Sequence, residues 1–392
     1  MCNAVCTLSR FAVEFDARAT RVVLAAVFQP GYSSTMGNKW ASHWGCVGIG
    51  VLAGSIAGCG GSSGPAQAPF VPPTPVPAQY LYFPATLANG TGAIVDVGAT
   101  ASGTVTPVTA ITDANGGLGY LCVDGSGAFY AVETAEGTGN STFAIVEFGA
   151  GTGGAATPAR TISGSSTGLV ASAALVSSSN YPIGVDTKGD IAVAMNGAGL
   201  DAIEYFSSTA NGNVAPSATI TIPAAFAGTI TRVAVSSSGA ISALNLESGS
   251  KGYQLLTFAA GASGTTTPTL VASFPANTLA DGLMVDGSGN LYVASTAVTS
   301  VNGVLTALVP TIQEFAPGAT TATKTISPAN DPVRMFEMQL DSSGNLYVLC
   351  EDLSLTNVSV QSFAASASGS STPLATIVSA AFAGSDGSLA LH

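Results

Sequence analysis

Histidine is almost absent from this chain. Its 392 residues include only His43 and His392, one in an N-terminal leader and the other at the last position. Without a histidine in the body of the chain, a Ser-His-Asp triad, a histidine-activated thiol and a histidine metal site are excluded. A mechanism that uses Glu and Asp side chains stays open.

Charged residues are also scarce, at 8% of the chain, and the cations lie singly, as at Arg160, Lys188 and Arg232. The net charge is −12, so no basic patch is present to neutralise phosphates and we expect no nucleic-acid partner. The 47% hydrophobic content argues against disorder. Abundant Gly, Ser, Thr and Val residues are typical of short strands joined by tight turns.

Cysteines are few and have no metal-binding spacing. Of the six, only Cys122 and Cys350 follow residue 59, and both lie in strand-like stretches, where buried and inert thiols are the default. No Cys-x-x-Cys pair supports a zinc site. The repeats described below separate the two thiols by one blade, so we expect no disulfide.

Residues 1–58 form a leader. Within it, Gly45–Ile56 is an apolar run of small residues that is too short to span a bilayer and that fits a secretory signal. The run ends in Ala57-Gly58-Cys59, which resembles the bacterial lipobox, and the resemblance implies a lipid on Cys59. Signal peptides begin near the N-terminus, so we predict a true start at Met36 and a signal peptide over residues 36–58.

Two other interpretations of the leader stay open. The apolar run could be a Gly/Ala-rich stretch that arose by chance, or Val22–Phe28 could belong to a longer n-region. Residues 59–78 run from a Gly/Ser-rich to a Pro-rich composition, typical of a flexible segment followed by a semi-rigid spacer. A tether that holds a domain off a bilayer needs this composition, although a tail without a role would share it.

A hairpin signature recurs along the rest of the chain. In its clearest copy, Leu283–Ala294, two strand-forming runs flank residues 286–289, Asp-Gly-Ser-Gly. This sequence suits a type I turn followed by a residue with positive φ. The glycines before the second strand of each copy are Gly127, Gly189, Gly239, Gly289, Gly344 and Gly387. Their spacing of roughly 50 residues is the period of a four-stranded propeller blade.

Each unit continues with a third strand that ends in Phe and a fourth strand opened by Pro. The phenylalanines are Phe148, Phe206, Phe258, Phe315 and Phe363, and the prolines are Pro107, Pro158, Pro216, Pro268 and Pro373. The unit of Phe315 lacks its proline. Proline is tolerated at the start or edge of a strand, where the sheet needs no amide donor. We therefore predict an all-β chain in which residues 79–392 form a β-propeller.

The two ends of this region complement each other. Tyr80–Phe83, Ile94–Val97 and Pro107–Ile111 supply the second, third and fourth strands of a blade, and Ala380–Leu391 supplies the missing first strand. Pairing of the terminal strands would close the ring and remove exposed sheet edges. This pattern predicts six blades. A seventh, partial blade is the rival, because Leu389–Leu391 could duplicate the role of Tyr80–Phe83.

These units resemble those of the NHL-repeat and related six-bladed propeller families, which carry a similar Val-Asp-x-x-Gly-Asn-Leu-Tyr-Val core. The resemblance covers residues 79–392 and implies the fold. It implies no function, because this hairpin occurs in binding scaffolds and in enzymes alike.

The acid at the tip of each hairpin has a structural explanation. Asp124, Asp186, Asp286 and Asp341 each open a turn, where a short acidic side chain accepts hydrogen bonds from backbone amides two residues on. Ser236 can do the same in the remaining copy. We predict turn structure here, and not a ring of ligands.

Acidic residues also gather between the second and third strands of the units. These candidates for a ligand-binding face are Glu133, Glu136, Asp201, Glu247, Glu351 and Asp352. In a propeller these loops share a face with the connectors between blades, which carry Asp113, Asp281, Asp331 and Arg334. The structural interpretation is a solvated rim that keeps a low-charge protein in solution. The functional interpretation is a shallow site for a divalent metal or cationic ligand, and we expect no other cofactor.

The favoured hypothesis is a lipid-anchored propeller of the bacterial cell envelope, periplasmic or at the cell surface. It would bind or scaffold a protein or glycan ligand without catalysis, and reach the bilayer through its N-terminal lipid. One alternative is a lactonase- or lyase-type enzyme with a carboxylate-bound divalent metal; the gluconolactonase-like propellers hold such a metal, but no matching motif occurs here. Another is a structural or adhesive protein with Ser/Thr-rich outer faces.

Overall fold

The computed structural model describes two short N-terminal strands and most of residues 79–392. The gaps in the latter are residues 88–90, 114–116, 136–141, 170–181, 197–201, 248–250, 302–303, 330–332, 353–356, 380–381 and 383–387. In a first unit, Met1–Pro73, β1 (Ala12–Glu14) pairs antiparallel with β2 (Val23–Ala25). The predicted start at Met36, the lipid site at Cys59 and the tether lie outside the described residues. The second unit, Thr74–His392, contains every other strand.

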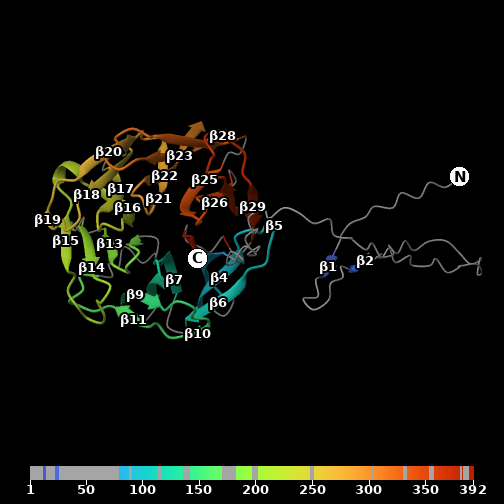
Figure 1. Cartoon of the computed structure of the whole chain (residues 1–392). Helices are drawn as coiled ribbons and strands as arrows, with labels where there is room; N and C mark the ends of the chain where they lie inside the picture. The colour runs from blue at the N-terminus through green and yellow to red at the C-terminus, as the bar shows by residue number, and fades with distance from the viewer. Residues whose placement is uncertain are drawn as a thin grey trace, which may run out of the picture. The chain divides into compact units, whose positions relative to one another are not determined.

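Six small sheets surround a central axis as the blades of a propeller (Figure 1). From the inner strand outward, blade 1 contains β30 (Ala390–Leu391), β3 (Tyr80–Thr86), β4 (Gly92–Gly98) and β6 (Val108–Asp113). Blade 2 contains β7 (Gly117–Val123), β8 (Phe129–Ala135), β9 (Thr142–Phe148) and β11 (Arg160–Ile162). Blade 3 contains β12 (Ile183–Val185), β13 (Ile191–Met195), β14 (Ala202–Phe206) and β15 (Ala218–Thr221). The predicted all-β propeller of six blades is therefore confirmed.

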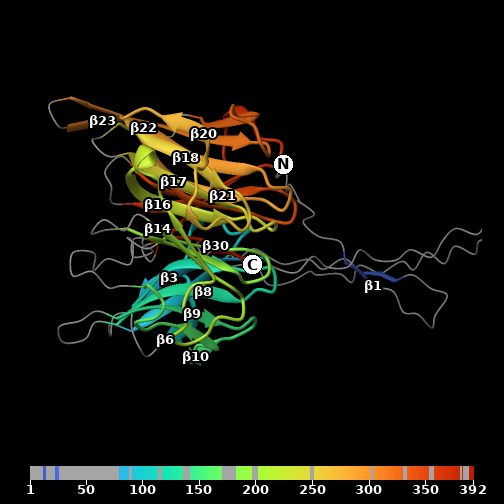
Figure 2. The ribbon, with the colours of Figure 1, turned by 90° about the vertical axis from the view of Figure 1, so that its left-hand side faces the viewer.

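Blades 4 to 6 follow the same order. Blade 4 contains β16 (Gly228–Val235), β17 (Ile241–Glu247), β18 (Tyr253–Phe258) and β20 (Thr269–Phe274). Blade 5 contains β21 (Thr278–Val285), β22 (Leu291–Val301), β23 (Val304–Phe315) and β24 (Lys324–Pro328). Blade 6 contains β25 (Arg334–Leu340), β26 (Leu346–Glu351), β27 (Val358–Phe363) and β29 (Ala375–Val378). A short 3-10 helix, η2 (Ala224–Phe226), precedes blade 4. Strands β22 and β23 are longer than their counterparts and project beyond the other strands on one face (Figure 2).

The terminal strands close the ring. Leu391 pairs with Leu81 in an antiparallel register, and the amide of Tyr80 donates to the carbonyl of His392 over 2.8 Å. Strand β30 thus takes the inner position of blade 1, and the C-terminus lies near the axis of the ring (Figure 1). The rival seven-blade count is wrong, because Ala390 and Leu391 pair with the second strand of blade 1 and do not duplicate it.

Short parallel strands join neighbouring blades, a feature that the sequence analysis missed. Each comes from the loop before the fourth strand of one blade and pairs with the fourth strand of the preceding blade. The pairs are β5 (Gly103–Thr104) with β29, β10 (Gly154–Ala156) with β6, β19 (Gly264–Thr265) with β15, and β28 (Gly369–Ser371) with β24. A single parallel bridge, Ile162 to Gly212, joins blades 2 and 3.

The junction between blades 4 and 5 differs from the other five. Across the continuous segments 251–301 and 304–329, strand β20 has no parallel partner from blade 5. A groove of about 380 Å³ lies there, between Thr269 and Val271 on β20 and residues 316–320. This is the unit in which the sequence lacks the proline before its fourth strand.

The hairpin turns have the predicted chemistry. In the clearest copy, Asp286 Oδ1 accepts hydrogen bonds from the amides of Ser288 (2.8 Å) and Asn290 (2.9 Å). The same two bonds occur at the acids of the other copies, Asp124, Asp186 and Asp341. The turn glycines have φ between 79° and 87° at Gly127, Gly189, Gly239, Gly289 and Gly344. Gly387 lies outside the described residues.

The apolar core lies between the blades. Six clusters of buried apolar side chains occupy the six interfaces between neighbouring sheets. The predicted third strands end at buried phenylalanines, which are Phe148, Phe206, Phe258, Phe315 and Phe363. Burying each ring removes a large apolar area from water and holds adjacent sheets face to face. No helix among the described residues is long and apolar enough to cross a bilayer.

Candidate ligand site in the central channel

Four of the inner strands carry a β-bulge at a similar height in the channel. The register against the second strand shifts between Gly119 and Leu121 in β7, Ile230 and Arg232 in β16, Ala280 and Gly282 in β21, and Met335 and Met338 in β25. A bulge breaks the alternation of side chains and re-aims the residues beside it. The residues at or next to these shifts include Tyr120, Arg232, Asp281 and Glu337.

Three of these side chains, from alternate blades, meet in the channel. Nη1 of Arg232 (blade 4) donates to Tyr120 Oη (blade 2) over 2.5 Å and to the carbonyl of Thr231 over 2.7 Å. The guanidinium also lies 5.3 Å from the centre of the Tyr120 ring, a cation–π distance. On its other side, Arg232 Nε is 3.5 Å from Glu337 Oε2 of blade 6. We call Tyr120, Arg232 and Glu337 the channel trio.

The backbone of Tyr120 is strained. Its φ is +33°, and it is the only non-glycine residue with positive φ among those described. This conformation costs free energy for a residue with a Cβ, and such strain persists where the surrounding structure imposes it, often at functional sites. The bulge and the bond from Arg232 hold Tyr120 in the channel.

Burial sets the protonation states around the channel trio. It raises the pKa of Glu337 to about 7, against the opposing effects of Arg232 and the Met338 amide. Burial also raises the pKa of the Cys122 thiol, which donates to the carbonyl of Ile183 over 3.3 Å. Cys122 and Cys350 are both free cysteines, as predicted. A thiol with a raised pKa is a poor nucleophile.

A second ion pair joins the inner strands of blades 5 and 6. Nε and Nη2 of Arg334 each lie 2.8 Å from Asp281 Oδ2, and the guanidinium stacks 4.6 Å from the centre of the Phe336 ring. Both charged residues were predicted in connectors between blades. They lie in strands instead, Asp281 in the bulge of β21 and Arg334 at the first position of β25. Burial raises the pKa of the nearby Tyr253 to about 12, and Asp281 adds to this effect.

A cavity of about 200 Å³ occupies the channel. The channel trio lines it together with Gln339, and Val123, Val185, Val235 and Val285 of four inner strands line it nearer the hairpin turns. Residues of those turns also line it, among them Gly125, Thr187, Ser237 and Gly287. The site is thus a pocket of mixed polar and apolar lining, with one cation, Arg232, and three carboxylates, Asp186, Asp286 and Glu337.

The six acidic candidates do not converge on this cavity. Glu133 lies within β8 and not in a loop, with 8% of its surface exposed, and burial raises its pKa, with Asp113 adding to the effect. Glu247 ends β17 and accepts a bond from Gln254 over 2.8 Å. Glu351 ends β26, and burial raises its pKa although Arg334 opposes the rise.

The remaining acidic candidates form no cluster of carboxylates among the described residues. Asp352 accepts a 2.6 Å bond from the side chain of Asn357. Glu136 and Asp201, and Asp331 in a connector, fall in the gaps between described segments. Where side chains are described, no group of three or more His, Cys, Asp or Glu residues is placed to hold a metal ion. A divalent metal at this rim therefore has no donor set in the described part of the chain.

The sequence analysis did not identify the channel trio. The only signal was a polar residue in the middle of a first strand, as in residues 118–121 (Leu-Gly-Tyr-Leu), 230–233 (Ile-Thr-Arg-Val) and 335–338 (Met-Phe-Glu-Met). Alternation alone would send some of these side chains toward solvent or the next blade. The bulges that re-aim them have no reliable local signature.

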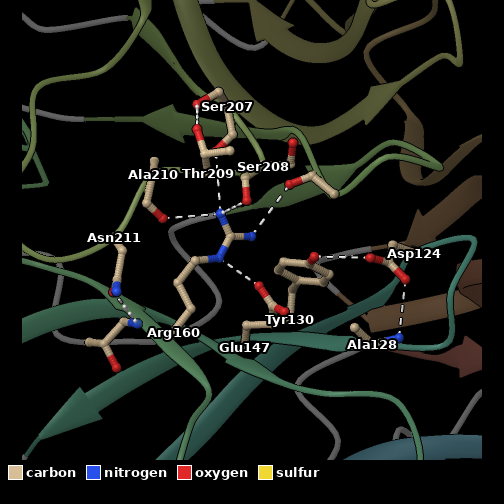
Figure 3. Close-up of polar contacts among 12 residues, drawn as sticks. Asp124, Ala128, Tyr130, Glu147, Arg160, Ser207, Ser208, Thr209, Ala210 and Asn211 are labelled. Atoms are coloured by element: carbon tan, nitrogen blue, oxygen red, sulfur yellow. Dashed lines mark hydrogen bonds and ion pairs between the residues drawn. The ribbon is translucent and has the colours of Figure 1, made fainter.

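Arg160 forms another buried polar cluster, but its donors are occupied (Figure 3). Nε lies 2.5 Å from Glu147 Oε2, and Nη1 donates to the carbonyls of Ser208 (2.7 Å) and Ala210 (3.0 Å) on the next blade. The guanidinium also lies over the ring of Tyr130. These contacts tie blade 2 to blade 3 and give Arg160 a structural role.

Comparisons with known proteins support no assignment beyond the fold. No family model and no curated protein matches the chain. A protein of unknown function from Bacteroides caccae is similar in structure, with 9% identity, a TM-score of 0.46, and coverage of 80% of this chain and 98% of that one.

Two other solved structures show the same weak likeness. The WD40 domain of coronin from Toxoplasma gondii has 12% identity and a TM-score of 0.42, over 76% of this chain and 68% of that one. A putative oxidoreductase (glucose dehydrogenase) from Thermus thermophilus has 15% identity and a TM-score of 0.41, over 70% and 91%. Identities this low assign no ligand or activity, so the resemblance to NHL-repeat units stays a prediction.

Proposed function

We propose that this protein is a lipid-anchored propeller of the bacterial cell envelope that binds a small ligand in its central channel without transforming it. The anchor rests on the lipobox-like Ala57-Gly58-Cys59 and on the Gly/Ser- and Pro-rich tether that follows. The binding role rests on the channel cavity. Its volume of about 200 Å³ would admit a protein or glycan ligand only through a terminal group.

One observation carries the binding role: a pre-formed cavity contains a cation that the protein itself only partly satisfies. The cavity walls come from rigid inner strands, so a ligand would meet an organised site and lose little free energy in ordering it. Any activity of this propeller must also reside where its blades differ, and the channel trio is such a place.

A substitution at the cavity lining tests this role. Gly287 lines the cavity, does not have a positive φ and has open space around an added Cβ, so Gly287→Trp should fold and place an indole at the cavity lining. Gly98→Trp is the matched control, because Gly98 has equal space and does not line the cavity. We expect some member of a panel of small acids, sugars and amines to raise the Tm of the wild type and of the control, but not of Gly287→Trp. Equal shifts in all three proteins, or none in any, would reject the channel as the binding site.

A second candidate, a lactonase- or lyase-type enzyme, draws on Glu337. Its pKa of about 7 suits a general acid or base at neutral pH, and the Tyr120 hydroxyl shares the same cluster. Turnover of simple lactones by the wild type and its loss in Glu337→Gln would favour this candidate. Absence of turnover would favour the binding role.

A further inference from the structure

We propose that the channel site is specific for a small monocarboxylate, which accepts a hydrogen bond from Nη2 of the Arg232 guanidinium beside Glu337. This proposal deepens the proposed function and rests on it, since it requires the channel to be a binding site. It names the chemical class of the ligand.

The hydrogen bonds of Arg232 leave Nη2 without an acceptor among the described residues. A guanidinium has five N–H donors, and Nη1 uses its own on Tyr120 Oη and the Thr231 carbonyl. Nε is buried and has no hydrogen-bond partner, and no described residue accepts from Nη2. The whole residue is only 9% exposed. Nε faces Glu337 and is shielded from solvent, so Nη2 is the donor that a carboxylate ligand would bind.

Glu337 neutralises this cation without saturating it. The Nε–Oε2 distance of 3.5 Å exceeds the roughly 2.8 Å of a charge-assisted hydrogen bond. A buried guanidinium with no anion nearby would be costly, so Glu337 keeps the empty site stable. Glu337 faces Nε, so Nη2 stays available to a carboxylate ligand.

A bound carboxylate would place a second negative charge beside Glu337. Two adjacent carboxylates are stable in a buried site only when they share a proton. Glu337 can hold that proton because burial already raises its pKa to about 7. The titratable and charged groups that face it are Arg232 of β16 and Tyr120 and Cys122 of β7, with Asp281 of β21 close enough to affect Tyr120 and Arg232. Binding should therefore take up a proton above neutral pH.

The rest of the lining favours a small, singly charged acid. Val123, Val185, Val235 and Val285 line the end nearer the hairpin turns, where a short alkyl chain would lie, and the cavity of about 200 Å³ limits its length. Asp186 and Asp286 also line the cavity and would repel a second negative charge on the ligand. A dicarboxylate or a phosphate is therefore disfavoured relative to a monocarboxylate.

Calorimetric titration of the full-length protein in detergent with butyrate and with its neutral isostere butyramide tests the proposal. We expect butyrate to bind at pH 6 and butyramide to bind at least roughly tenfold more weakly. Butyrate affinity should fall about tenfold from pH 6 to pH 8, with linked proton uptake. Arg232→Lys retains the charge but lacks the Nη2 donor, and should weaken butyrate binding roughly tenfold.

Glu337→Gln provides the decisive variant, and it serves equally if Arg232→Lys does not fold. It should remove the pH dependence and strengthen butyrate binding at pH 8, which a merely structural residue would not do. Equal binding of butyrate and butyramide, or an unchanged pH dependence in Glu337→Gln, would overturn the carboxylate assignment. If sugars or amines bind and Gly287→Trp blocks them while carboxylates do not bind, the carboxylate assignment fails and the channel role stands. If nothing in the panel binds, both fail.

Discussion

Arg232 and Glu337 face each other across the central channel from the inner strands of blades 4 and 6, with 3.5 Å between Nε and Oε2. Each lies at or beside a β-bulge of its strand, and both line the same cavity. The contact spans blades that are not neighbours, so it depends on how blades 4, 5 and 6 pack together around the channel.

Glu337→Gln should change how stability depends on pH. The folded-state pKa of Glu337 is raised from 4.5 to about 7, so between these values the folded protein holds a proton that the unfolded chain has released. The stability of the wild type should therefore fall, relative to Glu337→Gln, as pH rises from 4.5 to 7, and the difference should level off above pH 7. The total change is on the order of 3 kcal/mol. Urea unfolding of both proteins from about pH 5 to 8 measures it, and parallel curves would contradict the raised pKa.

Gly282→Ala should destabilise the contact between blades 5 and 6. A Cβ on Gly282 would overlap the carbonyl oxygen of Phe336, a backbone atom that cannot move aside. We expect a loss of roughly 1–3 kcal/mol, as for other overpacked sites. Gly287→Ala, in the turn of the same hairpin with open space around it, should change stability by less than about 0.5 kcal/mol. Chemical denaturation measures the free energy of unfolding of both variants. Equal losses would show that the inner strands of blades 5 and 6 move apart easily enough to admit the added Cβ.

Arg160→Ala should cost more stability than the equivalent change Lys324→Ala. Both cations open a fourth strand, pair in register with a Glu of the third strand, and donate to a carbonyl of the next blade. The Arg160 side chain is 10% exposed and makes several bonds, so we expect a loss of about 2–3 kcal/mol. Lys324 lies 3.8 Å from Glu314 and is more exposed, so its loss should stay below about 1 kcal/mol.

The comparison requires the same unfolding transition in both variants. Thermal and urea unfolding followed by fluorescence would supply it. A larger loss for Lys324→Ala would mean that the carbonyl contacts between blades 2 and 3 contribute little.

Cys59→Ser should release the protein from membranes. The lipid that we propose on Cys59 requires the thiol, and a serine hydroxyl cannot form the thioether. Cys46→Ser, also upstream of the propeller, is the matched control and should leave the protein membrane-bound. Fractionation of cells that express each variant measures the distribution, and retention of Cys59→Ser in the membrane fraction would refute the anchor.

Blade number and strand order follow from local chemistry. Asp286 accepts bonds from amides only two and four residues further along the chain. Each hairpin can therefore be recognised from a short stretch of sequence wherever that stretch occurs. The parallel strands between blades were not predicted, because residues such as Gly369 pair with a strand of another blade. Their short stretches of Gly followed by Ala, Ser or Thr resemble ordinary turns.

The hairpins, the buried phenylalanines and the complementary ends of a six-bladed ring could all be predicted from the chain alone, since each depends on neighbouring residues or on simple periodicity. The site could not. Tyr120, Arg232 and Glu337 meet because three bulges re-aim their side chains into one channel, and burial there raises the pKa of Glu337. Neither a bulge nor a desolvated carboxylate can be recognised from neighbouring residues, because both arise when distant strands pack together.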